Sequence, residues 1–302
     1  MTPDPDGVLV VDKPAGPTSH DIVAAARRAL GTRRIGHTGT LDPNASGVLP
    51  LVVGRATRLA QYLTSCDKEY RATLRFGIET DSYDATGRIV RETGRMPDAA
   101  ALAAALEPFR GTREQVPPPY SAKKLGGTPA YELARRSAAV VLAPVRVTVG
   151  SLELASVNPP CATVTLTCSA GFYVRSLARD LGEVLGTGAI LEELTRTRAG
   201  SFSLEDALPF EQLVTAARHV LRARLIPLEG LLLDLPAARV TAEAVRRVAH
   251  GQELRPADFA VDGGQDDGRF VRLVAPDLRL LGLAKPAKMG GFLRPVVVFG
   301  LE

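Results

Sequence analysis

The sequence predicts an α+β fold: a mixed, largely antiparallel central sheet, followed by a small β-rich domain. Strand-like segments at 7–14, 69–80 and 145–157 alternate with helical segments that follow no regular strand–helix–strand repeat. A cluster of short strand candidates follows a proline-containing link near residue 235. The 302 residues are enough for one large domain and one small domain, which we place at 1–235 and 236–302.

The composition is that of a globular protein, with 45% hydrophobic and 23% charged residues. The net charge of +4 permits an RNA partner without requiring one. No stretch has the length and apolarity of a membrane span, and the polar start MTPDPDG lacks a signal-peptide core, so we expect no membrane association. The sparse cysteines indicate reduced thiols and a cytoplasmic protein, and the four histidines have no metal-ligand spacing, so we expect no metal: Cys66, Cys161 and Cys168.

The N-terminal third of the chain predicts a strand, a helix, a loop and a buried strand. GVLVVDKP at 7–14 is the first strand, and a helix follows at 19–30. Thr18 and Asp21 have the spacing of a capping box, and Gly31 is a suitable C-terminal stop. After the loop 31–47, the apolar run VLPLVVG at 48–54 is typical of a buried strand.

The middle of the chain predicts two strand pairs, two helices and a projecting loop. The loop, 115–136, begins with three prolines, carries a Gly-Gly pair and ends in a short helix. The other segments, in chain order, are a strand at 69–80, a turn and short strand at 81–90, an alanine-rich helix at 98–109, strands at 145–157 and 161–169, and an amphipathic helix within 171–186.

The C-terminal domain is predicted from a strand and helix across 234–254 and three later strands. These are RFVRLVA at 269–275, LRLLGLA at 278–284 and PVVVF at 295–299.

The string GHTGTLDPNASGVLP at 36–50 is the strongest functional signal in the chain. Its glycines allow a backbone that bends sharply and approaches a ligand closely, and Pro43 biases Asp42 away from helical conformation. A carboxylate on a tight loop beside a buried strand is well placed to react with a substrate. An isolated Gly-x-x-Asp-Pro is usually only a turn, so the length of the whole string decides the interpretation.

This string resembles the catalytic motif of the TruB family of tRNA pseudouridine synthases. GVLVVDKPAGPTSHD at 7–21, GFYVRSLARDLG at 171–182 and LTRTRAGSF at 194–202 resemble further motifs of that family, in the expected order. PPPYSAKKLGGTPAYELAR resembles the family's RNA-clamping insertion, which we place at about 115–145. The resemblance implies a pseudouridine synthase domain and a C-terminal PUA-like RNA-binding domain.

The resemblance also implies the chemistry: isomerisation of a T-loop uridine, at position 55 in tRNA numbering, to pseudouridine. Asp42 would be the nucleophile, Arg175 its charged partner, and Tyr70 a residue that stacks on the base. The isomerisation transfers no electrons overall, so we expect no cofactor. The remaining candidates would bind substrate or support the catalytic loop: His37, Tyr173, Leu194 and, beneath the loop with Pro14, Lys13.

The expected partner is tRNA, bound through its T-arm and, at the C-terminal domain, its acceptor stem. The target base must be flipped out of a folded loop, and recognition would rest on loop shape and phosphate contacts. We expect a monomer without an obligate protein partner. The residues expected to contact the RNA backbone lie in pairs beside the matched motifs: Arg33, Arg34, Lys123, Lys124, Arg196 and Arg198.

Three alternatives remain open. The same isomerisation could act on another RNA, such as ribosomal RNA. A chaperone that binds and remodels tRNA would need no turnover, and the presence of Asp42, Tyr70 and Arg175 argues against it. A hydrolase using Asp42 lacks a second matched acid, a metal site or a Ser–His pair.

Overall fold

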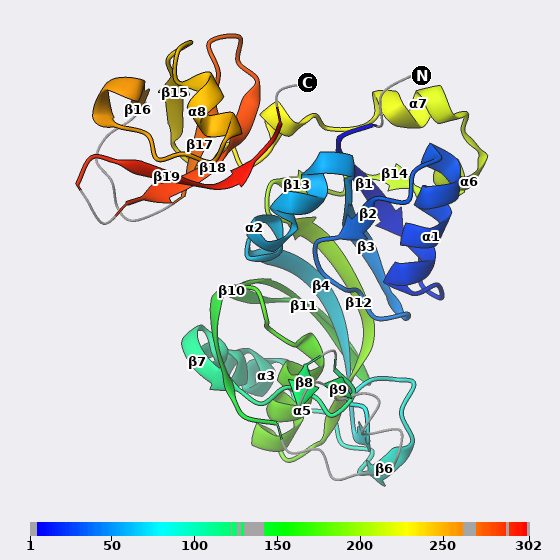
Figure 1. Ribbon diagram of the computed structural model, residues 1–302. Coiled ribbons are helices and arrows are strands. Elements are labelled where there is room, and N and C mark those ends of the chain that lie inside the picture. The colour runs from blue at the N-terminus through cyan, green and yellow to red at the C-terminus, as the bar shows by residue number, and fades with distance from the viewer. Residues whose placement is uncertain are drawn as a thin grey trace.

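The computed structural model describes residues 5–121, 123–125, 128–129, 142–261, 270–287 and 290–300. Within these residues, ten strands form one mixed sheet in the order β14-β1-β3-β12-β4-β11-β10-β7, with β13 and β2 paired to β12 and β3 (Figure 1). The pairs β1–β14 and β3–β12 are parallel and the others are antiparallel, so the predicted fold class is confirmed. The strands are β1 (Gly7–Lys13), β2 (Ile35–His37), β3 (Ala45–Val53), β4 (Lys68–Phe76), β7 (Gly111–Gln115), β10 (Val145–Asn158), β11 (Cys161–Cys168), β12 (Ala189–Ala199), β13 (Phe202–Ser203) and β14 (Leu208–Pro209).

A second, five-stranded sheet lies towards the C-terminus, in the order β16-β15-β17-β18-β19. Its strands are β15 (Ala237–Val240), β16 (Phe259–Val261), β17 (Val271–Val274), β18 (Leu280–Pro286) and β19 (Leu293–Val298). Two hairpins complete the described strands: β5 (Ile78–Thr80) with β6 (Ile89–Glu92), and β8 (Lys124–Leu125) with β9 (Thr128–Pro129).

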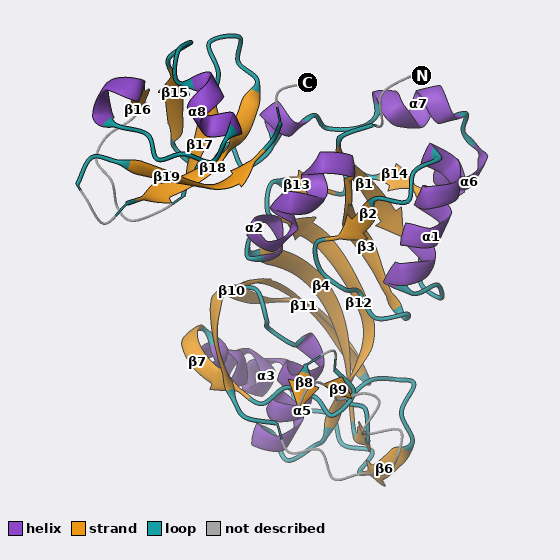
Figure 2. Ribbon diagram, viewed as in Figure 1, coloured by secondary structure: helices purple, strands orange, loops and turns teal. Residues whose placement is uncertain are grey.

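Short helices cover both sheets (Figure 2). The α-helices are α1 (Ser19–Leu30), α2 (Ala60–Thr64), α3 (Ala99–Leu106), α5 (Val174–Val184), α6 (Phe210–Thr215), α7 (Arg218–Ala223) and α8 (Val245–Ala249). The 3-10 helices are η1 (Gly54–Leu59), η2 (Glu107–Phe109), η3 (Leu228–Gly230) and η4 (Pro256–Asp258).

The predicted local signals at α1 are confirmed. Thr18 and Asp21 form both hydrogen bonds of a capping box, and Gly31 ends the helix in the left-handed region with φ 70°. The strand expected at 69–80 is wrong in one respect, because Gly77 at φ 84° breaks it into β4 and β5. The strand expected at 48–54 begins earlier, at Ala45. The short helix expected near the end of the 115–136 loop lies outside the described residues.

Two apolar cores lie on one face of the large sheet. One packs α1, α6 and α7 against alternate residues of β1 and β3, such as Leu9 and Leu49. The other packs α3 and α5 against β4, β10 and β11, through residues such as Leu74. Tyr70 of β4 and Leu194 of β12 are half-buried and contact both cores. The two residues therefore mark the middle of the sheet, where the helices leave a gap.

The opposite face of β1 and β3 packs against η1, α2 and the linking segment 228–232, and the C-terminal sheet joins the same cluster. Leu280 and Leu283 of β18, with Phe299, join the same buried cluster as Val52 and Leu59. The C-terminal sheet also has a core of its own beneath α8, formed by residues such as Leu273 and Ala284. The two sheets are thus joined by apolar packing as well as by the linking segment.

Replacing Leu283 with alanine should lower the free energy of unfolding by about 2–5 kcal/mol, because it opens a cavity in this shared cluster. Leu278→Ala is the matched control: this leucine is 62% exposed, so its truncation should change stability by less than about 0.5 kcal/mol. Urea denaturation of the full chain measures both. Equal midpoints for the two variants would contradict the packing role of Leu283.

Candidate active site

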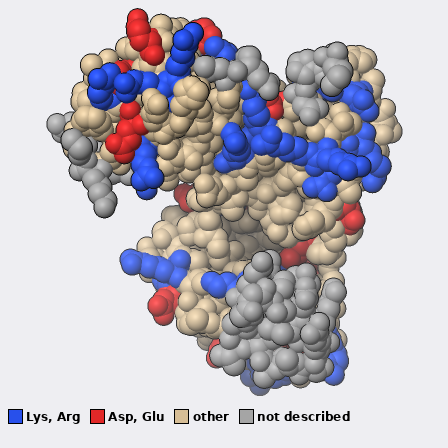
Figure 3. All heavy atoms as spheres, in the orientation of Figure 1, with Lys and Arg blue, Asp and Glu red and all other residues tan. Residues whose placement is uncertain are grey.

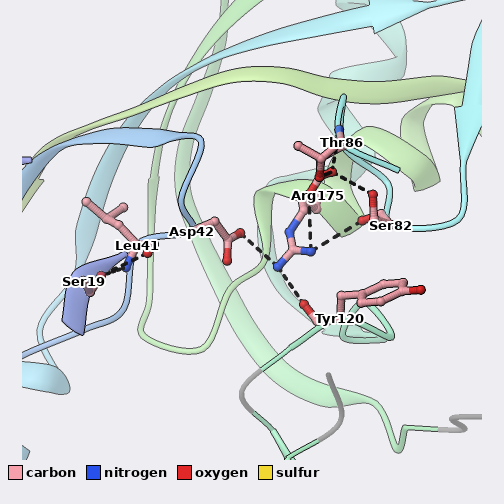
Figure 4. A network of polar contacts seen from close by, with 8 residues as sticks. Ser19, Leu41, Asp42, Ser82, Thr86, Tyr120 and Arg175 are labelled. Atoms are coloured by element: carbon pink, nitrogen blue, oxygen red, sulfur yellow. Dashed lines mark hydrogen bonds and ion pairs between the residues drawn. The ribbon is translucent and has the colours of Figure 1, made fainter. Parts of the chain in front are cut away.

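The loop that carries Asp42 is fixed by hydrogen bonds on both sides. The Leu41 N–H donates to Ser19 Oγ at 2.9 Å, and the Ser19 hydroxyl donates to the Leu41 carbonyl at 3.0 Å (Figure 4). Below the loop, Lys13 Nζ donates to the carbonyls of Pro43 and Ala45, at 3.1 and 2.6 Å. The first turn of α1 and the end of β1 therefore hold the two residues that flank Asp42.

Glycine at position 47 allows the neighbouring strand to approach this loop. Gly47 has φ 100°, and a Cβ atom there would lie 2.2 Å from the Arg196 carbonyl oxygen. The parallel pairing of β3 with β12 places Leu194 opposite Ala45 and Arg196 opposite Gly47. This pairing brings the segment 194–196 beside the loop that carries Asp42.

Asp42 forms an ion pair with Arg175 at the start of α5. Asp42 Oδ2 lies 2.9 Å from Arg175 Nη2, and the same nitrogen donates to the Tyr120 carbonyl at 2.9 Å (Figure 4). Asp84 Oδ2 lies 3.5 Å from Arg175 Nη1. Asp84 in turn accepts hydrogen bonds from the Ser82 and Thr86 hydroxyls. Arg175 Nη1 also donates to the Ser82 carbonyl at 3.5 Å, so the guanidinium is oriented by two carboxylates and two backbone carbonyls.

Burial raises the pKa of Asp42 above its ordinary value of 3.8, and the nearby Asp84 carboxylate raises it further. Arg175, the expected charged partner, and Lys13 lower the pKa of Asp42. Their effect does not fully offset the loss of hydration. The carboxylate keeps an open side, because its side chain is 43% exposed.

A pocket of about 270 Å³ opens over Asp42. Its wall brings together residues from the β2–β3 loop, β4, the start of α5 and β12 that the sequence placed in one site: Asp42, Tyr70, Tyr173, Arg175 and Leu194. Burial raises the pKa of both the Tyr70 and Tyr173 hydroxyls, so both stay protonated at neutral pH. The pocket therefore combines a carboxylate paired with a guanidinium, two neutral phenols and an apolar side chain.

The structure corrects two expected roles. Arg196 was expected to contact RNA phosphates, but it is 1% exposed, and its guanidinium donates to the carbonyls of Val48 and Gly39. Lys13 was placed both beneath the loop and among the substrate-binding residues. Its side chain is fully buried, and its contacts are with the loop backbone, so it supports the loop rather than reaching a substrate.

His37 lies on β2, outside the pocket wall. Its Nδ1 accepts a hydrogen bond from the Gly39 N–H at 3.3 Å, and its ring packs edge-on against His20 with centroids 5.5 Å apart. Burial lowers the pKa of His37, and His20 and Arg196 lower it further. A neutral imidazole at this place can pack against a base rather than bind a phosphate.

The other residues expected to contact phosphates differ in their exposure and in their side-chain partners. Arg33 and Arg34 are exposed, although Arg34 Nε donates to the Thr57 hydroxyl. Arg198 pairs with Glu69 at 2.7 Å. Lys123 is exposed, and the Lys124 side chain lies outside the described part of the structure.

Two residues of the site were missed in the sequence. Asp84 was interpreted as part of a turn, although that turn carries two acids, Asp81 and Asp84, directly after a strand. Lys68 lines the pocket and is 6% exposed, and its place two residues before Tyr70 on a strand puts it on the same face.

The described residues contain no group of three side chains that could hold a metal ion. No described helix is long and apolar enough to span a membrane.

Two family models match the chain in succession. The N-terminal domain of the TruB family of pseudouridylate synthases matches residues 27–174, and the C-terminal domain of tRNA pseudouridylate synthase B matches 175–233. Both matches lie in the part of the chain that builds the large sheet. The five-stranded sheet follows them.

Curated relatives named tRNA pseudouridine synthase B match nearly the whole chain. The Burkholderia mallei protein is 43% identical over 290 residues, covering 96% of this chain and 95% of its own. The Symbiobacterium thermophilum protein is 48% identical over 254 residues, covering 82% of each chain.

Similar solved structures cover 98% of this chain. A Cbf5–Nop10–Gar1 complex matches with a TM-score of 0.76 and 27% identity, covering 84% of its own chain. An H/ACA ribonucleoprotein bound to a substrate RNA containing 2'-deoxyuridine matches with a TM-score of 0.74 and 26% identity, also covering 84% of that chain. With more than 40% identity over almost its full length to synthases of one family, and Asp42 and Arg175 paired in its central pocket, this chain belongs to the TruB family of pseudouridylate synthases.

Proposed function

We propose that this protein isomerises uridine to pseudouridine in the T-loop of tRNA, at position 55 in tRNA numbering. The observation that carries the proposal is the Asp42–Arg175 ion pair at the wall of a pocket that also contains Tyr70. The family and the names of the relatives support the reaction and the substrate class. A tRNA substrate agrees with action in the cytoplasm.

In the proposed reaction, the target uridine leaves its stack and enters the pocket beside Tyr70. Flipping costs a few kcal/mol, which stacking and edge contacts in the pocket offset. Asp42 Oδ attacks C1′, so a C1′–O bond forms and the C1′–N1 bond breaks. The uracil turns, C5 bonds to C1′ and the C1′–O bond returns its electrons to Asp42. C5 then loses its proton and N1 gains one, so that the product is an isomer of the substrate.

We propose roles for the surrounding residues on the same geometry. Arg175 orients Asp42 and favours its ionised form, while Asp84 orients Arg175. Tyr70 and Leu194 enclose the base from the two strands at the middle of the sheet. Tyr173, whose backbone is fixed by Gln115, closes the pocket from the start of α5.

We propose that exposed basic residues in the upper part of the molecule, in the orientation of Figure 1, contact RNA. Figure 3 shows Lys and Arg side chains spread over this part of the surface, above a hollow in the molecule. Arg33 and Arg34 belong to the exposed set, in the segment just before β2. We also propose that residues 236–302 form a PUA-like domain that contacts the acceptor stem, and that the 115–145 insertion contacts the T-arm.

Two alternative functions, an RNA chaperone and a synthase acting on another RNA, can be tested directly. An RNA chaperone would retain its effect on tRNA folding without Asp42. The same isomerisation on another RNA would show as conversion of that RNA and not of tRNA. Incubating the pure protein with unmodified tRNA and mapping pseudouridine by chemical probing tests the main proposal and both alternatives.

Asp42→Asn should abolish turnover while tRNA binding stays within a few-fold. Asparagine keeps the size of the side chain and removes the nucleophile, so the rate should fall more than about a thousandfold, or roughly 4 kcal/mol of barrier. Asp67→Asn is the matched control, because Asp67 is an exposed acid near the site with no side-chain contact to Arg175. A single-turnover assay that left Asp42→Asn with a tenth of the wild-type rate would remove Asp42 from its central role.

The rate should fall on acidification at a pH above the ordinary aspartate pKa of 3.8, because Asp42 must be ionised to attack and its pKa is raised. Arg175→Met removes a cation that lowers the pKa of Asp42, so the midpoint should move to higher pH. Asp84→Asn removes an anion that raises it, so the midpoint should move to lower pH. Single-turnover rates on a T-arm hairpin measure both, and a shift of the two midpoints in the same direction would contradict this account.

Arg33→Ala should weaken tRNA binding and reduce the dependence of log Kd on log salt by about 0.7–0.9, the contribution of one phosphate contact. Arg146→Ala on β10 removes the same charge from another exposed position and serves as the control. Binding titrations between about 50 and 200 mM salt measure the slopes. Identical slopes for the Arg33 variant and the wild type would show that this arginine is a solvated surface charge.

A further inference from the structure

Of the five buried charged residues in the described part of the chain, four lie at one place and are positive, and the fifth is Asp258 of η4. Three almost fully buried cations line the active-site pocket, and a fourth lies beneath the Asp42 loop: Lys68 at 6%, Arg175 at 7% and Arg196 at 1% exposure, and Lys13 at 0%. The acids at the site are Asp42 and Asp84, with side chains 43% and 17% exposed. Burying a charge costs several kcal/mol of folding free energy. Burying more positive than negative charge at one place is therefore a cost that a function of these cations would explain.

Two of these cations are matched by the acids, and two are not. Arg175 pairs with both carboxylates, and Lys13 lies near Asp42. Lys68 and Arg196 have no carboxylate within 4.0 Å among the described residues, and the acid that acts electrostatically on Lys68, Asp67, is exposed rather than in the pocket wall.

Lys68 and Arg196 bind backbone carbonyls instead. Lys68 Nζ donates to the carbonyls of Thr64 and Cys66, and Arg196 Nε donates to the Val48 carbonyl at 2.7 Å. A carbonyl satisfies an N–H group but leaves the positive charge in place.

The two unmatched cations lie on the same face of the sheet as the residues that enclose the base. Lys68 and Tyr70 are two residues apart on β4, so their side chains point to one face. Arg196 is the cross-strand neighbour of Tyr70 on β12. Lys68, Tyr70 and Arg196 all line the pocket that contains Asp42. The pocket wall therefore carries three cations, Lys68, Arg175 and Arg196, and one carboxylate, Asp42.

The proposed reaction creates a negative charge in this pocket. When the C1′–N1 bond breaks, its electron pair goes to N1, and the detached uracil is an anion until C5 bonds to C1′. Fixed charges act strongly on such a group where water is excluded.

We propose that Lys68 and Arg196 are electrostatic groups of the active site, whose buried charge stabilises the uracil anion while it is detached from the ribose. This inference rests on the proposed isomerase function. The competing account is structural: Lys68 would cap the carbonyl end of α2, and Arg196 would hold the catalytic loop. Both accounts predict that a variant of Lys68 or Arg196 reacts more slowly. The test must therefore change the target base of the RNA as well as the protein.

The experiment compares T-arm hairpins that carry uridine or 5-fluorouridine at the target position. Fluorine withdraws electrons and stabilises the detached ring, which then needs less help from the protein. Lys68→Gln keeps two N–H donors for the carbonyls and removes the charge. Three proteins are compared at saturating concentration: the wild type, Lys68→Gln and Lys68→Arg. In each single-turnover reaction, nuclease digestion and chromatography measure how fast the original nucleoside disappears from the hairpin.

We expect Lys68→Gln to slow loss of uridine by about tenfold or more, and loss of 5-fluorouridine by a clearly smaller factor. Lys68→Arg should retain the wild-type ratio of the two rates, because it keeps the charge. Arg71→Met, an exposed position on the opposite face of β4, should leave both rates unchanged.

Equal slowing of both hairpins by Lys68→Gln would overturn the proposal in favour of the structural account, and so would no slowing at all. Arg196→Met tests the second charge in the same comparison, and binding of the hairpin measures the folded fraction of every variant. Failure of the wild-type protein to convert uridine would instead overturn the proposed function.

Discussion

The ion pair between Asp42 and Arg175 is the interaction on which the rest of the site depends. A carboxylate close to a protein interior loses hydration, and here the loss raises its pKa despite the guanidinium 2.9 Å away. The pair can keep this geometry because each partner is held separately. Ser19 and Lys13 hold the loop of Asp42, whereas Asp84 and the Tyr120 carbonyl hold Arg175. Several elements of the fold thus meet in one contact.

The segment that leads into the 115–145 insertion is part of the same network. Gln115 exchanges two hydrogen bonds with the backbone of Tyr173, and the Ser176 hydroxyl donates to the Val116 carbonyl. With the Tyr120 carbonyl on Arg175, these bonds tie the start of the insertion to the first turn of α5. Hydrogen bonds thus link the pocket wall at 173–176 to the segment 115–120, although more than fifty residues separate them in sequence.

The sequence predicted features that depend on local patterns. The capping box of Thr18 and Asp21 follows from residue spacing, and the fold class follows from alternation and the lack of a repeat. The family motifs brought Asp42, Tyr70 and Arg175 into one site, and the structure places all three around one pocket. Each of these signals lies within a single segment or a known combination of segments.

The features that were missed depend on strand register and long-range packing. An arginine in LTRTRAG resembles a surface charge until β12 pairs with β3 and β4 and encloses Arg196 in the sheet. Likewise, Asp84 is a turn residue until α5 places Arg175 beside it. Charge balance in a pocket is a sum over residues that the fold brings together, so no single segment reveals it. The excess of positive charge around Asp42 emerges only once the burial of Lys68 and Arg196 is known, and it is there that the structure adds most to the chemistry.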